Sequence, residues 1–160
     1  MTIVYQTNTG SSEEYARLLS EKISAPYVAL SESADISADE EIIFIGWIMA
    51  GTVQGLAEAI GKFSNIRCIC AVGMMSSEKA QKEIAEKNNT ELPLFVLPGN
   101  FHLDRLKGMY KMMMSMAMKM IKAKLKEEGG ENAEKMIAAF DNGIDMVDGE
   151  KLAPVIEFLG

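Results

Sequence analysis

The stretch QTNTGSSEEYA, residues 6–16, joins an apolar run to a helical pattern through a turn rich in hydroxyl groups. The run before it, residues 2–6, is rich in residues that favour β-strands. Residues 11–23 repeat apolar side chains at helical spacing, and Ser11 followed by Glu14 has the spacing of a capping box. The turn itself contains no lysine or arginine. The sequence therefore predicts a strand, a neutral polar turn and a helix, in that order.

Strand and helix patterns alternate along residues 2–101. Further strands are predicted at 27–30, 41–47, 66–72 and 93–101, where β-forming or continuous apolar runs occur. Helices are predicted at 52–63 and 76–89, the second capped by Ser76 or Ser77. An acidic loop, residues 31–41, replaces the helix that would join the second and third strands. This order predicts an α/β protein with a parallel sheet and helices on both faces.

The pattern changes after residue 101. One long helix is predicted over 103–126, and Gly129-Gly130 ends it. Shorter helices follow at 132–140 and 151–159. No linker divides the chain, so we predict a single domain, 1–160, with a Met-rich basic helical insertion at about 103–130.

Composition limits the classes of function. The chain has 160 residues, 48% of them hydrophobic, and a net charge of -7, which suits one globular domain and argues against nucleic acid as a partner. We find neither a secretion signal nor a run of about 18 apolar residues. Cys68 and Cys70 are expected to be small buried residues on one face of a strand. The chain has a single histidine, His102, and is expected to have no metal site. Because its two cysteines are expected to stay reduced, we expect the protein to work in the cytoplasm.

The hydroxyl-rich turn lies where open α/β folds bind ligands, at the carboxyl edge of the sheet. A helix N-terminus there offers N–H groups and the positive end of the helix dipole to an anion. The Walker pattern is excluded because no lysine follows, and the GxGxxG fingerprint is excluded because only Gly10 is present. Two interpretations remain: a polar turn with a helix cap, or a phosphate cradle of hydroxyls and amides made by Thr7, Asn8, Thr9, Gly10, Ser11 and Ser12.

The residues Thr7, Thr9, Gly10 and Ser12 match the pattern T-x-T-G-x-[ST], and in this the turn resembles the phosphate loop of the flavodoxins. The resemblance implies a flavodoxin-like three-layer sandwich with a five-stranded parallel sheet in the order 2-1-3-4-5. It also implies one non-covalently bound flavin mononucleotide (FMN), whose phosphate the six cradle residues hold. Phosphoryl-receiver domains share this topology, but the acidic pair that they need after the first strand is replaced here by Gln6-Thr7.

The same resemblance places the loops after the third and fourth strands against the flavin ring. It implies that Trp47, Met49, Ala50 and Gly51 border one side of the ring. Gly73 and Met74, or Met75 in place of Met74, border the other. Flavodoxins commonly carry a tyrosine and acidic residues in the second of these loops, and this chain has neither.

The segment 103–126 holds seven of the thirteen methionines, and seven basic residues against one acidic residue, a charge of 7 − 1 = +6. One helical face is traced by Leu106, Met109, Met113, Met116 or Ala117, Met120 and Lys124 or Leu125. Met112, Met114 and Met118 fall outside this face. The segment is either a core helix with a solvated basic side or a docking surface for an acidic protein, an anionic membrane or a flat apolar substrate, with residues 105–126 making the contact. A long basic insertion at this position is similar to that of the menaquinone-dependent protoporphyrinogen dehydrogenases.

Three functions follow from these resemblances. The first is an FMN-binding redox protein that passes electrons to a redox protein or a small redox substrate. The second is a flavin-dependent oxidoreductase of the protoporphyrinogen dehydrogenase type that passes electrons to a quinone, for which His102 is a weak catalytic candidate. The third is a flavin-free interaction domain on the same fold.

Overall fold

The structure is a computed structural model that describes residues 1–74 and 77–160. The chain forms two compact units. The first contains residues 1–99 and 147–160, and the second contains residues 100–146. The predicted insertion at about 103–130 lies within the second unit.

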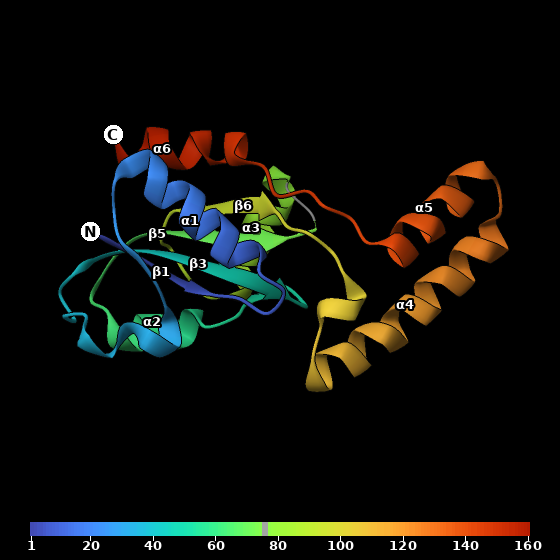
Figure 1. Ribbon diagram of the computed structural model, residues 1–160, viewed down its shortest axis with the longest axis horizontal. Coiled ribbons are helices and arrows are strands. Elements are labelled where there is room, and N and C mark those ends of the chain that lie inside the picture. Colours follow the sequence, from blue (N-terminus) through green and yellow to red (C-terminus); the bar gives the residue numbers. More distant parts are fainter. Residues whose placement is uncertain (75–76) are drawn as a thin grey trace. The chain divides into compact units, whose positions relative to one another are not determined.

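The first unit is built on a parallel sheet, and its strand order, β2-β1-β3-β5-β6, is the order predicted from the sequence (Figure 1). Parallel pairing runs through the whole path, for example from Val4 in the first strand to Phe44 in the third. The strands are β1 (Thr2–Gln6), β2 (Tyr27–Ala29), β3 (Glu41–Met49), β5 (Asn65–Gly73) and β6 (Leu94–Pro98).

Helices cover both faces of this sheet and complete the predicted three layers. The helices α1 (Ser11–Ile23) and α6 (Ala153–Leu159) pack on one face, where Tyr15 and Val155 join a buried cluster. The helices α2 (Leu56–Lys62) and α3 (Glu78–Lys87) pack on the other face. Ser77 caps α3 by accepting a hydrogen bond from the backbone N–H of Ala80, at 3.1 Å. Short 3₁₀ turns, η1 (Leu30–Asp35) and η3 (Gly149–Leu152), complete this unit.

The strand β3 contributes side chains to the apolar clusters on both faces of the sheet. Ile43 and Ile45 belong to the cluster under α1 and α6, whereas Ile42 and Phe44 belong to the cluster under α2 and α3. All four side chains are fully buried. Each contributes about 1.5–3 kcal/mol through burial of apolar surface, which explains why this strand reads as a continuous apolar run. Cys68 and Cys70 are buried free thiols in the α1 cluster, as predicted.

The prediction of a helix over residues 52–63 is wrong in its first part. The strand β3 continues past Trp47 to Met49 and turns back as β4 (Thr52–Val53), an antiparallel hairpin, and the helix α2 begins only at Leu56. Both turn residues, Ala50 and Gly51, have positive φ, as a tight hairpin requires. The side chain of Asn88 fixes the hairpin, since it accepts from Val53 N–H and donates to Gly51 C=O, both at 2.9 Å.

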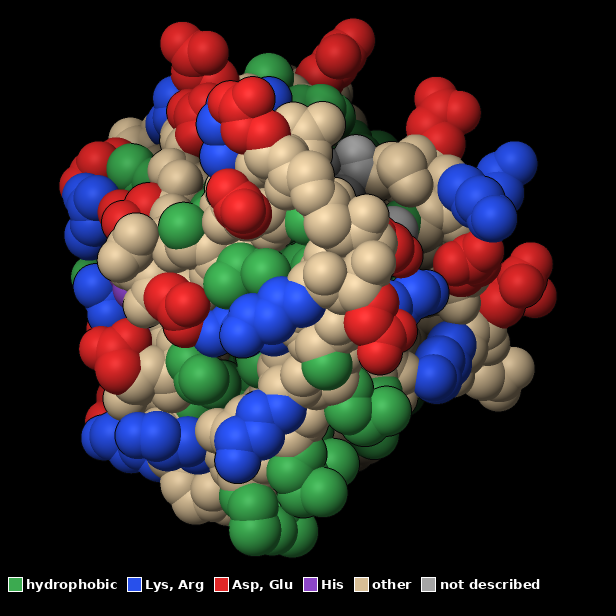
Figure 2. Space-filling model, turned by 90° about the vertical axis from the view of Figure 1, so that its right-hand side faces the viewer, with side chains coloured by type: hydrophobic (Ala, Val, Ile, Leu, Met, Phe, Trp, Pro, Cys, Tyr) green, Lys and Arg blue, Asp and Glu red, His purple; other side chains and the backbone are tan. Residues whose placement is uncertain are grey.

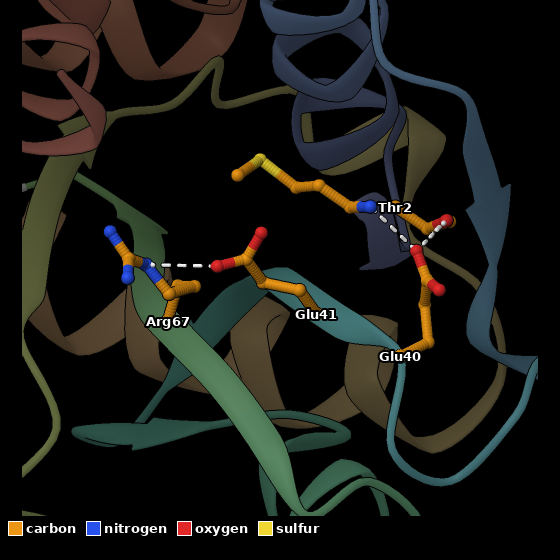
Figure 3. A network of polar contacts seen from close by, with 5 residues as sticks. Thr2, Glu40, Glu41 and Arg67 are labelled. Carbon is orange, nitrogen blue, oxygen red and sulfur yellow. Dashed lines mark hydrogen bonds and ion pairs between the residues drawn. The ribbon is translucent and has the colours of Figure 1, made fainter.

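Polar contacts tie together the amino-terminal ends of three neighbouring strands (Figure 3). Glu40 Oε1 lies 2.7 Å from the amino group of Met1 and accepts a hydrogen bond from the hydroxyl of Thr2. Glu41 pairs with Arg67 at 3.3 Å. These contacts fix the strands β1, β3 and β5 at the edge opposite to the hydroxyl-rich turn.

The second unit is a helical hairpin of α4 (Gly108–Glu128) and α5 (Glu131–Asn142), preceded by the 3₁₀ turn η2 (Leu103–Arg105). The predicted helix 103–126 therefore begins five residues late, and it ends at Gly129 as expected. Phe101 and Ile144 exchange backbone hydrogen bonds of 2.6 and 2.8 Å, which close the unit where the chain enters and leaves it. Over the described part of the chain, no helix has the length and the apolar character needed to cross a membrane.

The methionine face predicted for α4 is not the packed face. Met109, Met113, Met116 and Met120, which trace that face, are all exposed. Met118, which we placed outside it, is the one methionine of α4 that is buried. The helix is thus not an ordinary core helix, because most of its apolar side chains face solvent.

The hydroxyl of Tyr15 joins three segments of the first unit. It donates to the C=O of Pro98 at 2.7 Å and accepts from the N–H of Asp148 at 3.3 Å. The Tyr15 side chain is fully buried, and burial raises the pKa of its hydroxyl to about 12. Tyr15 therefore fixes the first unit at both points where the chain crosses to residues 100–146.

We expect Tyr15→Phe to lower the free energy of unfolding by about 1–3 kcal/mol, because it leaves two backbone groups without their partner. Chemical denaturation checks this, with Tyr27→Phe at an exposed tyrosine as the control. The pH dependence adds a second readout. Since the folded-state pKa lies above the ordinary value of 10.0, the neutral hydroxyl stabilises the fold below pH 10, and this contribution is lost as pH rises through about 12. Equal alkaline losses in the wild type and Tyr15→Phe would contradict the assignment.

Candidate functional site

The hydroxyl-rich turn is closed by a hydrogen bond to the side chain of Thr7. The N–H of Gly10 donates to the hydroxyl of Thr7 at 3.0 Å, and Gly10 adopts a φ of 98°. The first hydrogen bond of α1 then runs from Glu14 N–H to Gly10 C=O, at 2.9 Å. Helix geometry consequently leaves the amides of Ser12 and Glu13 without an acceptor inside the helix, at the positive end of its dipole.

The predicted capping box is wrong. Gly10 is the N-cap of α1, Ser11 is already inside the helix, and no side chain caps the helix N-terminus. The left-handed φ of Gly10 starts the helix one residue earlier than a serine cap would. The interpretation of this turn as a polar turn with a helix cap therefore loses its main support.

Two buried donors in this turn have no partner. Within residues 1–74 and 77–160, the buried side-chain atoms without a hydrogen bond are the amide nitrogen of Asn8 and the hydroxyl oxygen of Ser12. Ser12 is fully buried. A buried polar group without a partner costs about 1–3 kcal/mol, so its presence twice in one six-residue turn indicates a ligand or water with hydrogen-bond acceptors.

The charges near the turn are directed elsewhere. Burial, and then the nearby carboxylate of Glu13, raise the pKa of Tyr5, so the Glu13 carboxylate lies on the side of the Tyr5 hydroxyl. The guanidinium of Arg17 pairs with Glu21 at 2.6 Å. The turn thus contains neutral donors, and these donors would fit the acceptor oxygens of a phosphate.

Four of the residues predicted to border the flavin ring line one cavity of about 480 Å³. The β3–β4 turn contributes Ala50 and Gly51, and the end of β5 contributes Gly73 and Met74. The helix α3 closes the cavity with Lys87. The Lys87 side chain passes close to Gly51: a β-carbon added to Gly51 would lie 2.8 Å from Cδ of Lys87. The cavity is walled by apolar atoms and contains one cation, Lys87, and one acidic side chain, Glu83.

The other two predicted ring residues, Trp47 and Met49, do not line this cavity. Ile48 lies between them in β3 and does line it. Because successive side chains of a strand point to opposite faces, Trp47 and Met49 lie on the face of β3 that packs against α1. The residues predicted to border the flavin ring therefore lie on both faces of the sheet at β3, and not on one. Met75 lies outside the described residues.

The strand predicted at 93–101 ends at Pro98 in the structure, so His102 lies four residues beyond β6 and not directly at the end of the last strand. It belongs to the second unit, and its Nε2 lies 2.6 Å from Oδ1 of Asp145. The hydrogen bond to His102, followed by the charges of His102 and Arg105, lowers the pKa of Asp145. Gly143, with a φ of 85°, lies against the ring, where a β-carbon would be only 2.2 Å from His102 Nδ1. This arrangement holds the imidazole in one orientation.

A second cavity, of about 610 Å³, opens beside this histidine within the second unit. Its wall combines polar and aromatic side chains, among them His102, Lys111, Ser115, Phe140 and Asn142. The cavity therefore offers a ring surface and several hydrogen-bonding groups beside a histidine that a carboxylate orients.

Sequence reasoning missed three residues of these sites. Asp145 is 43 residues from His102, and no local pattern around it indicates the pairing. Lys87 and Glu83 lie on a helix that reads as an ordinary polar surface helix. Only the packing of α3 against the β3–β4 hairpin brings them to the first cavity.

Comparison with known proteins gave one match. A model of the flavodoxin domain family matches residues 2–128, which is more than half of the chain. No curated protein and no solved structure matched.

A comparison of two fully buried serines, Ser12 and Ser33, tests whether the Ser12 hydroxyl lacks a hydrogen-bond partner. We expect Ser12→Ala to leave the free energy of unfolding of the flavin-free protein unchanged or to raise it, because the hydroxyl removed has no partner. Ser33 is the matched control: its hydroxyl donates to Leu30 C=O at 2.7 Å and accepts from Lys62 at 2.8 Å. Ser33→Ala should cost about 1–3 kcal/mol. Urea denaturation of both variants checks this, and a loss for Ser12→Ala equal to that of Ser33→Ala would contradict it.

Proposed function

The chain belongs to the flavodoxin domain family, and on this premise we propose that it binds FMN without a covalent bond and carries electrons through the bound flavin. The observation that supports the proposal most directly is the pair of unpartnered buried donors, Asn8 and Ser12. Both lie in the turn where a flavodoxin holds the flavin phosphate. The redox chemistry would be supplied by the flavin, and the protein would bind and orient it.

The residues of the turn would hold the phosphate with neutral donors. The Ser12 hydroxyl and the Asn8 amide would donate to phosphate oxygens, together with the backbone amides at the start of α1. Thr7 would keep the turn closed through its bond to Gly10, and Thr9 and Ser11 complete the cradle. A dianion held by such donors keeps its full charge, since no lysine or arginine neutralises it.

The cavity bounded by Ala50, Gly51, Gly73 and Met74 would take one side of the flavin ring. Its apolar wall would exclude water from that side. Trp47 and Met49, on the other face of β3, would contact the flavin from the side of α1. The net charge of -7 disfavours an anionic reduced flavin, so the surroundings would lower its reduction potential. A low potential suits a carrier that delivers electrons to a redox protein or a small redox substrate. We expect it to work in the cytoplasm, where its two free thiols stay reduced.

Flavin titration tests the phosphate cradle. We expect the protein to quench the fluorescence of FMN and to bind it more tightly than riboflavin, which lacks the phosphate. Thr9→Val with Ser12→Ala should weaken FMN binding at least tenfold, about 1.4 kcal/mol, and leave riboflavin binding unchanged, because only the phosphate contacts are lost. Ser33→Ala, a buried serine in η1, is the control for an indirect effect of destabilisation.

The outcomes separate the alternatives. Binding of FMN and riboflavin with equal affinity would show that the turn does not hold a phosphate. No binding of either flavin at micromolar concentration would favour a flavin-free interaction domain on the same fold.

The second candidate function is a flavin-dependent oxidoreductase that takes electrons from an organic substrate and passes them to a quinone, as in the protoporphyrinogen dehydrogenases. The observation in its favour is the cavity beside His102 in the second unit. His102, oriented by Asp145, would accept the proton that the substrate releases on oxidation. Phe140 would contact a flat substrate through its ring, and Lys111 would contact an anionic group of it, although Asp104 and Asp141 line the same cavity.

Substitution of the histidine distinguishes this enzyme from a carrier. If the second function is correct, His102→Gln should lower the turnover of an organic substrate such as a porphyrinogen at least tenfold, because the proton acceptor is lost. FMN affinity, measured by fluorescence, should not change. Asp145→Asn should reduce turnover less, since it alters only the orientation of the ring. A carrier would show no turnover in the wild type, and reduction of an artificial acceptor would be equal in all three proteins.

A further inference from the structure

The helix α4 presents a row of exposed methionines, which we name the methionine ridge. A buried methionine is the ordinary case, and such side chains exposed together on one helix mark an interaction surface. The face shown in Figure 2 carries hydrophobic side chains interspersed with Lys and Arg, and Asp and Glu lie on it as well. The ridge consists of Met109 (67% exposed), Met112 (60%), Met113 (49%), Met116 (64%) and Met120 (75%).

The ridge lies on the side of α4 that is turned away from its partner helix. At 3.6 residues per turn, its five side chains fall within an arc of about 100°, centred opposite to Met118. Met118 is buried, and Lys122, about 40° from it around the helix, pairs with Asp141 of α5. The side of α4 that faces α5 therefore lies opposite to the ridge, and the exposed ridge contributes little to the packing of the helical hairpin.

Lysines border the ridge on both sides. Lys119 and Lys126 lie along one flank and Lys124 along the other, and all three are exposed. The only acidic residues of α4 are Glu127 and Glu128 at its C-terminal end, whereas the chain as a whole has a net charge of -7. The ridge is thus an apolar stripe within a positive border, on a protein that is otherwise negative.

We propose that the methionine ridge docks the protein on an anionic lipid membrane. In this position the methionines enter the boundary between headgroups and acyl chains, and the flanking lysines meet the phosphates of the lipids. An acidic protein partner suits the ridge less well. A single convex helix face needs a matching groove in a partner protein, whereas a lipid surface yields to it and unbranched methionines adapt to disordered chains. The proposal does not depend on flavin binding.

Vesicle sedimentation with the full chain tests the proposal. We expect the wild type to sediment with vesicles that contain phosphatidylglycerol and to stay in the supernatant with pure phosphatidylcholine vesicles. Raising the salt from about 0.1 M to about 1 M should weaken binding, because the Debye length falls from about 10 Å to about 3 Å. Met116→Asp with Met120→Asp, and separately Lys119→Glu with Lys124→Glu, should each lower the partition coefficient at least tenfold.

Each variant has a matched control in the first unit. Lys79→Glu with Lys82→Glu makes the same change of net charge on α3, where both lysines are exposed. Ile60→Asp places an acidic group at an exposed apolar residue of α2. Both controls should bind vesicles as the wild type does, apart from a small general effect of charge. Circular dichroism shows that the ridge variants keep their helices.

Oxidation gives an independent readout at the level of single residues. Mild peroxide should convert the five ridge methionines to sulfoxides in the free protein, because their sulfur atoms are accessible, and should spare the buried Met118. Anionic vesicles should protect the ridge methionines and leave the oxidation of Met136, an exposed methionine on α5, unchanged. The proposal is overturned if the wild type does not bind anionic vesicles, if the ridge variants bind as well as the controls do, or if only an acidic protein, and no vesicle, protects the ridge.

Discussion

The burial of β3 on both of its faces is the constraint on which the first unit depends. Ile43 and Ile45 enter one apolar cluster, and Ile42 and Phe44 enter the other. Because the period of a strand is two, a shift of register by a single residue would exchange these sets, and both close-packed clusters would have to repack around side chains of different shape. The position of β3 therefore fixes β1 and β5 as its neighbours, and through them the two helix layers. The carboxyl ends of all three strands then lie at the edge where the candidate site is formed.

The turn after β1 contains features that lower the stability of the fold locally. Gly10 starts the helix without a side-chain cap, and the hydroxyl of Ser12 is buried without a partner. A turn that served only the fold would place a serine or threonine as the cap and would satisfy its own hydroxyls. Two unsatisfied donors at a helix N-terminus instead fit the proposed phosphate site. The surrounding core, with Tyr15 at its centre, is large enough to tolerate this cost.

The second unit is held together by other contacts than the first. Its chain ends are held together by the hydrogen bonds between Phe101 and Ile144 and by the pairing of His102 with Asp145. Between these contacts, α4 buries Met118 against the rest of the unit and leaves its other side apolar and exposed. A helix with apolar side chains on two opposite faces has a weak amphipathic pattern, which explains why periodicity alone did not identify the packed face. Lysines flank both faces, and it is burial against the rest of the unit that distinguishes them.

The sequence by itself determined the strand order, through its resemblance to the flavodoxins, the bounds of β1 and α1, the buried cysteines and the position of the hydroxyl-rich turn. Each of these depends on local patterns, namely apolar periodicity, turn residues and a six-residue motif. The tertiary structure alone decided that Gly10 and not Ser11 begins the helix, that residues 47–53 fold back as a hairpin, and that Met118 is the buried methionine of α4. It also paired His102 with Asp145, 43 residues away. These features arise from contacts between segments distant in the chain. A local pattern contains no information on which of its faces such a contact will cover.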